Sequence, residues 1–344
     1  MSEAQAKALA SANMSKNLGG EMYNPYKTYT WDTLLDPATG KLKADAKSAW
    51  NESWMDEITN NAAIRTEHQF SVSGGNAKTK YMASFGYLYE DGVLKTTHFD
   101  RYSGRVNVDH QAKYWLKAGL NANLSYTESN SQQIGEGTYT SNAWYTAQFM
   151  APIYPMYLKD AEGKDILDEN GNRQYDYGEE YGRPKAEKFN TLGNLNDNKY
   201  EDKRDNVSFR ANIDFGGDDE KMGVLKGLKL SLNMGGDMVS KNIMNYYNMY
   251  HGDGASSKGD ITKYNERTFS YTINQLLTYN RKFGKHSIDF LAGHEFYAYK
   301  YNYLMANKTG LVDGIFDLAP GTTLAGGNSY THNYRVESYL GRLN

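Results

Sequence analysis

The stretch YSGRVNVD, Tyr102 to Asp109, decides the fold class because polar and apolar residues alternate along its second half one by one. A related pattern returns as SFRANID at 208–214 and as YLGRLN at 339–344. Residues two apart share a face in a β-strand, whereas in a helix they point in different directions. The repeated polar zigzag therefore predicts strands that have one charged, wetted face and one apolar face.

The clearest predicted strand is YWLKAGLNANLSYTES, in which Leu116, Leu120 and Leu124 share a face with other apolar side chains. Strands and turns alternate over residues 66–344 and amount to about nine strands. Residues 1–65 are mixed, with short helical pieces, and we expect a connector or extracellular loop region there. Breaks in the alternation predict long loops at about 130–204, 239–265 and 300–332.

Composition excludes several classes of protein. The net charge of -3 leaves no basic stripe for nucleic acid, and the absence of cysteine excludes disulfides and thiolate sites. No run of 18 apolar residues exists, so the sequence predicts no transmembrane helix. The opening residues MSEAQAKALASANM contain no basic segment followed by an apolar run, and they predict a short amphipathic helix rather than a signal peptide.

Two all-β architectures fit this alternation. A soluble β-sandwich or propeller would turn the apolar face inward, whereas a membrane barrel turns it toward lipid and encloses a polar lumen. Predicted strands close to the 9 to 11 residues of a tilted membrane strand favour the barrel. Aromatic residues near the strand ends favour it too, because such girdles lie at the lipid headgroups.

In a barrel, the charged and amide side chains of the zigzag would face the lumen. We expect most of them to form ion pairs and hydrogen bonds with neighbouring polar groups of the wet interior, rather than to contact a substrate. These predicted lumen-facing structural residues are Arg105, Asn107, Asp109, Arg210, Asn212, Asp214, Arg342 and Asn344.

Aromatic residues also collect in the predicted loops. They suit contact with a sugar or a partner protein, but they suit packing within the loops equally well, and the sequence leaves this choice open. The candidates for contact with a partner or substrate are Trp144, Tyr145, Tyr154 and Tyr157. The acidic stretch DILDENGNRQYDYGEE, 165–180, misses the calcium-loop spacing and predicts a solvated hairpin.

No enzyme motif is present. The sequence contains no G-x-S-x-G elbow, no phosphate-binding loop and no dinucleotide fingerprint, and its seven histidines lack zinc-site spacing. We therefore expect no catalytic residues, no cofactor and no metal.

Several of these stretches resemble the SusC/RagA family of TonB-dependent outer-membrane transporters of Bacteroidota. The resemblance is dense over residues 54–128, from WMDEI through the Ser-Gly-Gly and Arg-x-Asn segments. It returns in APIYPMY at 151–157, VLKGLKLSLNMGGD at 224–237, FLAGHE at 290–295 and ESYLGRLN at 337–344. It implies a partial antiparallel barrel, about nine strands of the roughly 22 that close around a plug in such transporters. The plug and the TonB-contacting segment would then belong to a longer chain.

The resemblance also implies a function and a place. It predicts TonB-dependent import of a nutrient across the outer membrane, more often a glycan or oligosaccharide than a peptide. The expected partners are a SusD-like surface lipoprotein, TonB through the missing N-terminal part, the substrate and outer-membrane lipid, with no nucleic acid. The alternative is a soluble β-rich carbohydrate-binding or hydrolytic protein, in which Leu116, Leu120 and Leu124 would pack into a core.

Overall fold

The computed structural model describes residues 18–131, 142–184 and 189–344; the amphipathic helix predicted at the N-terminus lies outside them. The described residues form one sheet of antiparallel strands that follow one another in sequence order. This confirms the predicted all-β class. The strands are β1 (Arg65–Gly75), β2 (Thr79–Asp91), β3 (His98–Lys113), β4 (Leu116–Asn130), β5 (Lys199–Gly216), β6 (Leu228–Tyr247), β7 (Asp260–Phe283), β8 (His286–Thr309) and β9 (Thr323–Leu343).

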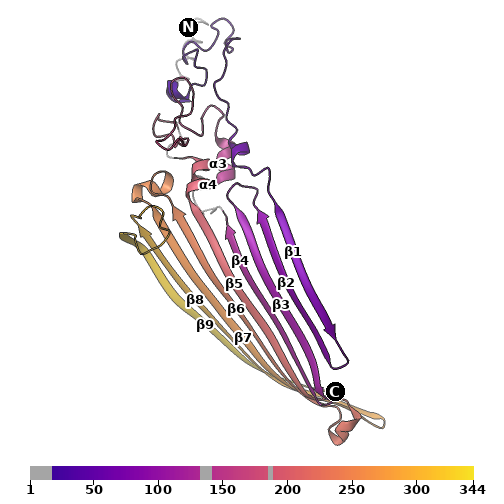
Figure 1. The fold of residues 1–344 in the computed structure, drawn as a ribbon. Coiled ribbons are helices and arrows are strands. Elements are labelled where there is room, and N and C mark those ends of the chain that lie inside the picture. The colour runs from indigo at the N-terminus through magenta and orange to yellow at the C-terminus, as the bar shows by residue number, and fades with distance from the viewer. Residues whose placement is uncertain (1–17, 132–141, 185–188) are drawn as a thin grey trace.

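Connections at the two ends of the sheet differ in length. The links β1–β2, β3–β4 and β7–β8 are tight turns, and β5–β6 carries only the short 3-10 helix η3 (Glu220–Leu225). In the first turn the Asn76 side-chain oxygen accepts hydrogen bonds from the backbone N–H groups of Lys78 and Thr79. The longest connection, β4–β5, emerges at the opposite end, which we call the loop end; Figure 1 shows α3, α4 and the N-terminal segment gathered there.

The register keeps the two faces of the sheet continuous from strand to strand. Val106 on β3 pairs with Ala83 on one side and with Ala122 on the other, while Arg105 pairs with Ser84 and Asn123. Directly paired residues project to the same side of an antiparallel sheet. Apolar side chains therefore form one face, and charged and amide side chains form the other.

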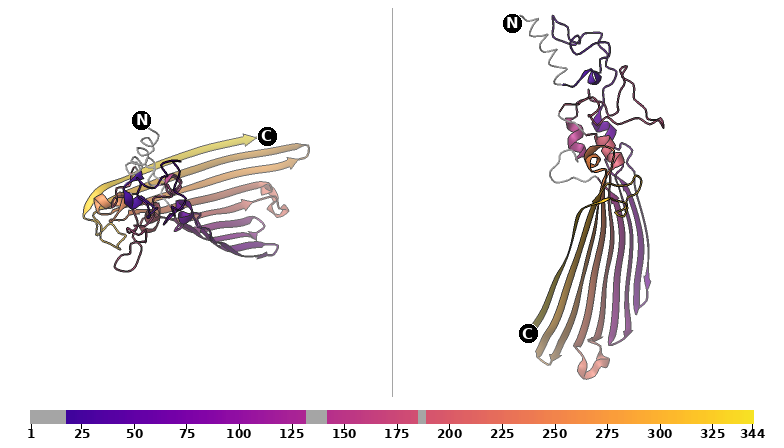
Figure 2. Two further views of the ribbon diagram at one scale, coloured as in Figure 1. Left: turned by 90° about the horizontal axis from the view of Figure 1, so that it is seen from above. Right: turned by 90° about the vertical axis from the view of Figure 1, so that its left-hand side faces the viewer.

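Nothing in the described residues covers the apolar face. Figure 2 shows a single curved layer, with the α-helices at the loop end and a short helical turn at the other. Phe70, Leu120 and Leu124 are 70%, 44% and 56% exposed. An uncovered apolar face of this extent marks contact with lipid or with another protein, and lipid-facing barrel strands have this pattern. The leucines of β4 do not pack into a core, which contradicts the alternative of a soluble sandwich.

The sheet is also staggered as a barrel wall must be. The row of paired residues that starts at Gly75, the last residue of β1, crosses β8 at Glu295, well inside a strand that begins at His286. Closing a sheet into a barrel requires such a stagger, together with tilted strands.

Four strands are longer than the sequence predicted. The expected loops at 239–265 and 300–332 are largely strand, because β6 runs to Tyr247, β7 begins at Asp260, β8 runs to Thr309 and β9 begins at Thr323. At 24 residues, β8 spans roughly 80 Å. Outside an apolar band of about 25 Å both faces of such a strand meet water. Hydrogen-bonded pairing continues there without the apolar alternation on which the prediction relied.

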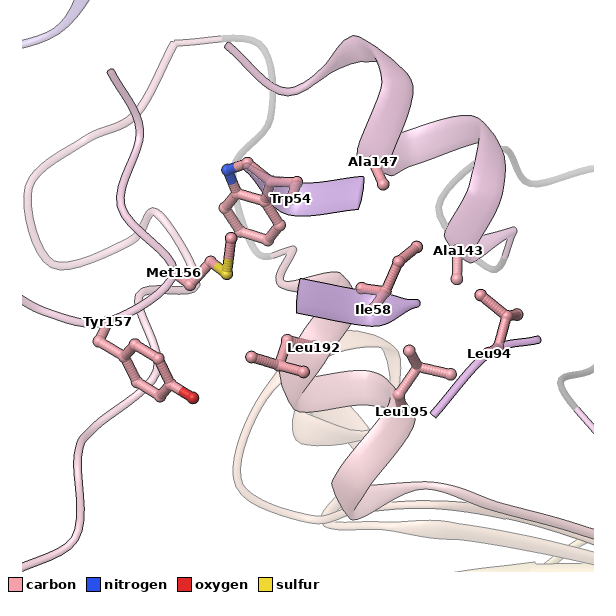
Figure 3. Close-up of a cluster of buried hydrophobic side chains, with 9 residues drawn as sticks. All are labelled: Trp54, Ile58, Leu94, Ala143, Ala147, Met156, Tyr157, Leu192 and Leu195. Carbon is pink, nitrogen blue, oxygen red and sulfur yellow. The ribbon is translucent and has the colours of Figure 1, made fainter. Parts of the chain in front are cut away.

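A small hydrophobic core lies at the loop end. It joins α2 (Trp54–Ile58) to α3 (Ala143–Phe149) and α4 (Thr191–Asp197). Figure 3 shows Ile58 lying between the alanines of α3 and the leucines of α4. Trp54 Nε1 donates a hydrogen bond to the Tyr154 carbonyl at 3.0 Å. The segment before β1 is thus fastened to the β4–β5 loop, while the remaining short helices are η1 (Glu21–Tyr23) and η4 (Gly252–Ser257).

Each of these α-helices starts at a polar cap. The side chains of Ser53, Asn142 and Asn190 accept hydrogen bonds from backbone N–H groups in the first turns of α2, α3 and α4. Within the described ranges, no helix is both long and apolar enough to cross a membrane.

Candidate functional site

The polar face carries hydrogen-bonded side-chain ladders across its strands. Arg105 Nε donates to Asn123 Oδ1 at 2.7 Å, and Asn123 Nδ2 donates to Ser208 Oγ at 3.3 Å. A second ladder runs from Asn233 to Asn274 Oδ1 at 3.1 Å and from Asn274 to Glu295 Oε2 at 3.3 Å. The first ladder borders a hollow of about 510 Å³, whose lining includes serine, asparagine and glutamine residues together with several apolar ones.

Ion pairs hold most of the remaining charged residues predicted for this face. Arg210 lies 4.0 Å from Asp237, and Arg342 lies 2.8 Å from Asp289. The partners of the predicted aspartates are Lys117 for Asp109, at 3.6 Å, and Lys229 for Asp214, at 3.2 Å. Exposed pairs of this kind contribute little to stability. The polar face therefore carries many charged side chains, but each of these charges has a neighbour of opposite sign.

The predicted amide residues occupy the same face. Asn107 pairs in register with Asn121, and Asn212 pairs with Asn233. Asn344 lies beyond β9, where its backbone N–H and carbonyl pair with those of Asp289 at 2.9 and 3.1 Å. The structure therefore brings the zigzag residues of three separate sequence stretches onto one surface.

Sequence reasoning missed a set of tyrosines on the polar face. In the segment YAYKYNY, 297–303, every second residue of β8 is tyrosine. Tyr299 lies in the row of pairs that also contains Ser208 and Arg105. The strict alternation was the available signal, but most of this segment lay in a predicted loop.

The four loop aromatics predicted for contact have different surroundings. Trp144 and Tyr145 project from the exposed side of α3 beside Phe149, whose ring lies 4.6 Å from that of Tyr145. Tyr157 is buried in the core at the loop end, with the Arg173 guanidinium 3.8 Å above its ring. Tyr157 therefore packs inside the loop region, which is one of the two roles that the sequence left open for it.

Tyr154 is half-buried and serves the same packing. Its ring meets the edge of the Tyr23 ring at 5.4 Å, and its carbonyl accepts the hydrogen bond from Trp54. Of the predicted contact residues, the structure leaves Trp144 and Tyr145 most open to a partner.

A buried ion pair lies within the β4–β5 loop, where a tyrosine of the N-terminal segment contacts it. Asp176 and Arg183 are fully buried 3.8 Å apart, and Asp176 Oδ1 accepts hydrogen bonds from the Tyr23 hydroxyl at 3.3 Å and the Gly178 N–H at 2.7 Å. Burial raises the pKa of Asp176 and lowers the pKa of Arg183, while their mutual attraction opposes both shifts. The prediction of a wholly solvated hairpin at 165–180 is therefore wrong at Asp176, although Asp168 caps an exposed turn.

A second contact joins two loops at the loop end. His251 Nε2 lies 2.6 Å from Asp197 Oδ2, and the imidazole stacks on the Tyr177 ring at 4.0 Å. Burial lowers the pKa of His251 to about 4 and raises the pKa of Asp197 to about 6. At neutral pH the Nε2–H group of a neutral imidazole therefore donates a hydrogen bond to the Asp197 carboxylate. In the part of the chain that is described, no three His, Asp or Glu side chains converge as metal ligands would.

Comparison with known proteins shows similarity to TonB-dependent receptors. The chain is 26% identical over 296 residues to the TonB-dependent receptor SusC of Bacteroides thetaiotaomicron, covering 81% of this chain and 26% of SusC. It is 24% identical over 307 residues to a TonB-dependent receptor of Formosa agariphila, covering 86% of this chain and 28% of that receptor. The solved RagAB peptide transporter superposes with a TM-score of 0.62 at 21% identity, over 94% of this chain and 34% of the transporter chain. No family model matches.

This chain spans about a quarter of the length of the curated relatives it matches. Both relatives are named as TonB-dependent receptors. Over most of its length the chain is thus similar to TonB-dependent receptors, SusC among them, and its antiparallel sheet has the fold of part of a solved transporter barrel.

Proposed function

We propose that the full-length receptor imports a nutrient across the outer membrane, driven by TonB, and that the polar face of this segment lines its lumen. The observation that carries the proposal is the single-layer sheet with an uncovered apolar face opposite a charged, hydrogen-bonded one. A wall between lipid and a wet interior uses both faces in this way. TonB would act through a part of the receptor outside this chain.

The loop end is the surface for partner and substrate. Its buried core, the Asp176–Arg183 pair and the His251–Asp197 contact fix the loops on the rigid strands. Rigidly mounted loops commonly carry binding sites. On this surface we place a SusD-like lipoprotein against the exposed aromatics of α3, which are Trp144, Tyr145 and Phe149.

The substrate that we propose is a glycan rather than a peptide. Exposed aromatic rings beside polar side chains suit sugars, which present both C–H faces and hydroxyl groups. The solved RagAB relative is a peptide transporter, so a peptide is the competing substrate. The soluble lectin or hydrolase has no comparable support, because Leu120 and Leu124 of β4 are exposed.

Growth of cells tests this function directly. Cells with the intact gene, cells without it and cells without functional TonB are grown on neutral oligosaccharides or on peptides as the limiting nutrient. We expect growth on at least one oligosaccharide to require both the receptor and TonB, and a surface lipoprotein to co-purify with the detergent-extracted receptor. Unchanged growth of the deletion strain on every nutrient, or recovery of the protein in the soluble fraction, would refute import.

A further inference from the structure

The tyrosines of β8 form a wet aromatic surface. Tyr297 and Tyr299 share rows with Arg210 and Arg105, respectively, and so lie on the polar face. On the same strand the phenylalanines at 290 and 296 lie on the opposite, apolar face. A buried tyrosine hydroxyl needs a hydrogen-bond partner, and water or a ligand supplies one on a wet surface. The hydroxyl-bearing rings of β8 thus face the polar side, and its plain phenyl rings face the apolar side.

Neighbouring strands extend this surface. The Tyr303 ring stacks on Tyr330 of β9 at 4.9 Å and lies 6.4 Å from Tyr264 of β7. Tyr330 and Tyr334 are about half exposed, at 51% and 55%. Along β8 the four rings cover roughly 20 Å. We call this set the tyrosine panel: Tyr264, Tyr297, Tyr299, Tyr301, Tyr303, Tyr330 and Tyr334.

The panel leads into a hollow toward the loop end. This hollow has a volume of about 340 Å³ and is lined by Tyr264 and Tyr303 of the panel and by Asp202 and Glu266, among others. A volume of this size lies in the range of small-ligand sites. The hollow therefore offers both ring faces and hydrogen-bond acceptors at one end of the panel.

All three carboxylates that line the hollow carry a counter-charge from the chain, and the first of them, Glu201, lies 3.1 Å from Lys203. Arg204 forms a hydrogen-bonded ion pair with Asp202, and Lys241 lies 3.5 Å from Glu266. An oxygen in such a pair keeps lone pairs free to accept further hydrogen bonds. Because the charges cancel locally, the hollow favours a neutral ligand rich in hydroxyl groups over a charged one.

We propose that the tyrosine panel and this hollow form a binding path for a neutral oligosaccharide on the lumen wall. Sugar rings would stack their C–H faces on successive tyrosines, while their hydroxyls bond to the tyrosine hydroxyls and to Asp202 and Glu266. Side chains on one face of a strand are about 7 Å apart, so β8 presents an aromatic ring at that interval along the wall. This inference rests on the proposed import function and assigns its substrate to particular residues.

The test uses the full-length receptor purified with its lipoprotein. The probe is the nutrient that supports receptor-dependent growth, and its affinity is measured by calorimetry. The variant Tyr264→Leu/Tyr303→Leu removes two rings that border the hollow. The control is Tyr271→Leu, which changes a tyrosine of β7 that lies on the apolar face beside Phe296.

We expect the double variant to raise the Kd of a neutral oligosaccharide by about tenfold, the scale of one or two aromatic contacts. The control should leave the Kd unchanged. Tyr303→Phe, which keeps the ring and removes only the hydroxyl, should lose less affinity than Tyr303→Leu. The KM of uptake in cells should rise in parallel with the Kd.

Other outcomes separate this path from import itself. If growth is receptor-dependent but the double variant binds and transports like the parent, the path is refuted and import stands. If the growth-supporting nutrient is a peptide, the ligand class is refuted. If the double variant fails to fold while each single variant keeps the parent Kd, the tyrosines pack against the receptor's own plug. That result also refutes the path. Growth that never depends on the receptor refutes the proposed function.

Discussion

Replacing Leu120 by arginine tests which face of the sheet meets lipid. Leu120 lies on the apolar face of β4, in register with Val108 and Ala211, about midway between Leu116 and Tyr126. Its position therefore corresponds to the middle of the apolar band. Arginine at the midplane of a barrel costs about 2–4 kcal/mol. At 1.4 kcal/mol per factor of ten, that cost lowers the folding equilibrium constant by about 30-fold to 700-fold.

The measurement is reversible unfolding of the full-length receptor in phospholipid vesicles by guanidinium chloride. The matched control is Ser125→Arg on the same strand. Ser125 lies on the polar face between Ser103 and Asn206, where a new arginine meets water and no cation directly opposite. We expect a free-energy change within about 0.5 kcal/mol for this surface substitution. Equal losses in the two variants, or a larger loss at Ser125, would show that the faces have been assigned the wrong way round.

Three further changes test the loop end. Asp176→Ala leaves a buried Arg183 without its carboxylate, so the local stability should fall by about 3–5 kcal/mol; hydrogen exchange at residues 20–24 and 189–198 measures this, and a loss no larger than at an exposed carboxylate would contradict it. Trp54→Ala should cost about 3–5 kcal/mol of local stability through a cavity in the core, measured by limited proteolysis, while exchange in β7 and β8 stays unchanged; faster exchange there would show that the core also supports the strands. Burial lowers the pKa of His251 to about 4, so its contribution to the stability of the loop contact is present at neutral pH and is lost as pH falls from 6.5 through 4. Burial raises the pKa of Asp197 to about 6, so the contribution of Asp197 increases as pH falls over the same range. Asp197→Asn should therefore reveal loosening of residues 248–259 on acidification, which the parent largely cancels; exchange rates at pH 7 and pH 5 check this, and equal pH responses would refute it.

The strands of the first half were readable from sequence for a physical reason. In β3 and β4 one face meets an apolar medium and the other meets water, so each residue must match its face and the alternation is strict. The alternation in β4 therefore assigns each residue to a face: the apolar face holds Leu116, Leu120 and Leu124, and the polar face holds Lys117, Asn121 and Ser125.

Two other features were hidden from the sequence. The loop-end halves of β6–β9 meet water on both faces, so residues such as Ser240, Lys241 and Asn242 show no periodic contrast, and only pairing with neighbouring strands reveals them. The fate of the loop aromatics depends on contacts between distant segments, as when Trp54 bonds to Tyr154. Local composition cannot separate a tyrosine buried by such a contact, like Tyr157, from one left open, like Tyr145.

The stagger of the sheet also accounts for charged residues on its apolar face. The row of pairs through Val106 on β3 continues through Ala122, Phe209 and Ala298 and ends at Arg335 on β9. In a flat, level wall Arg335 would then lie as deep in lipid as Val106, at a cost of several kcal/mol.

In a tilted wall, rows of pairs run obliquely to the membrane plane, so the same row rises from lipid on β3 to the headgroups or water on β9. Side chains nearer the turn end of β9 must then return to apolar ones, and Leu343 does so. Glu337, between these positions, is held 3.0 Å from His294 rather than left alone. The outward charges of β9 therefore agree with the stagger of the strand ends, and both indicate strands that tilt as they do in a closed barrel.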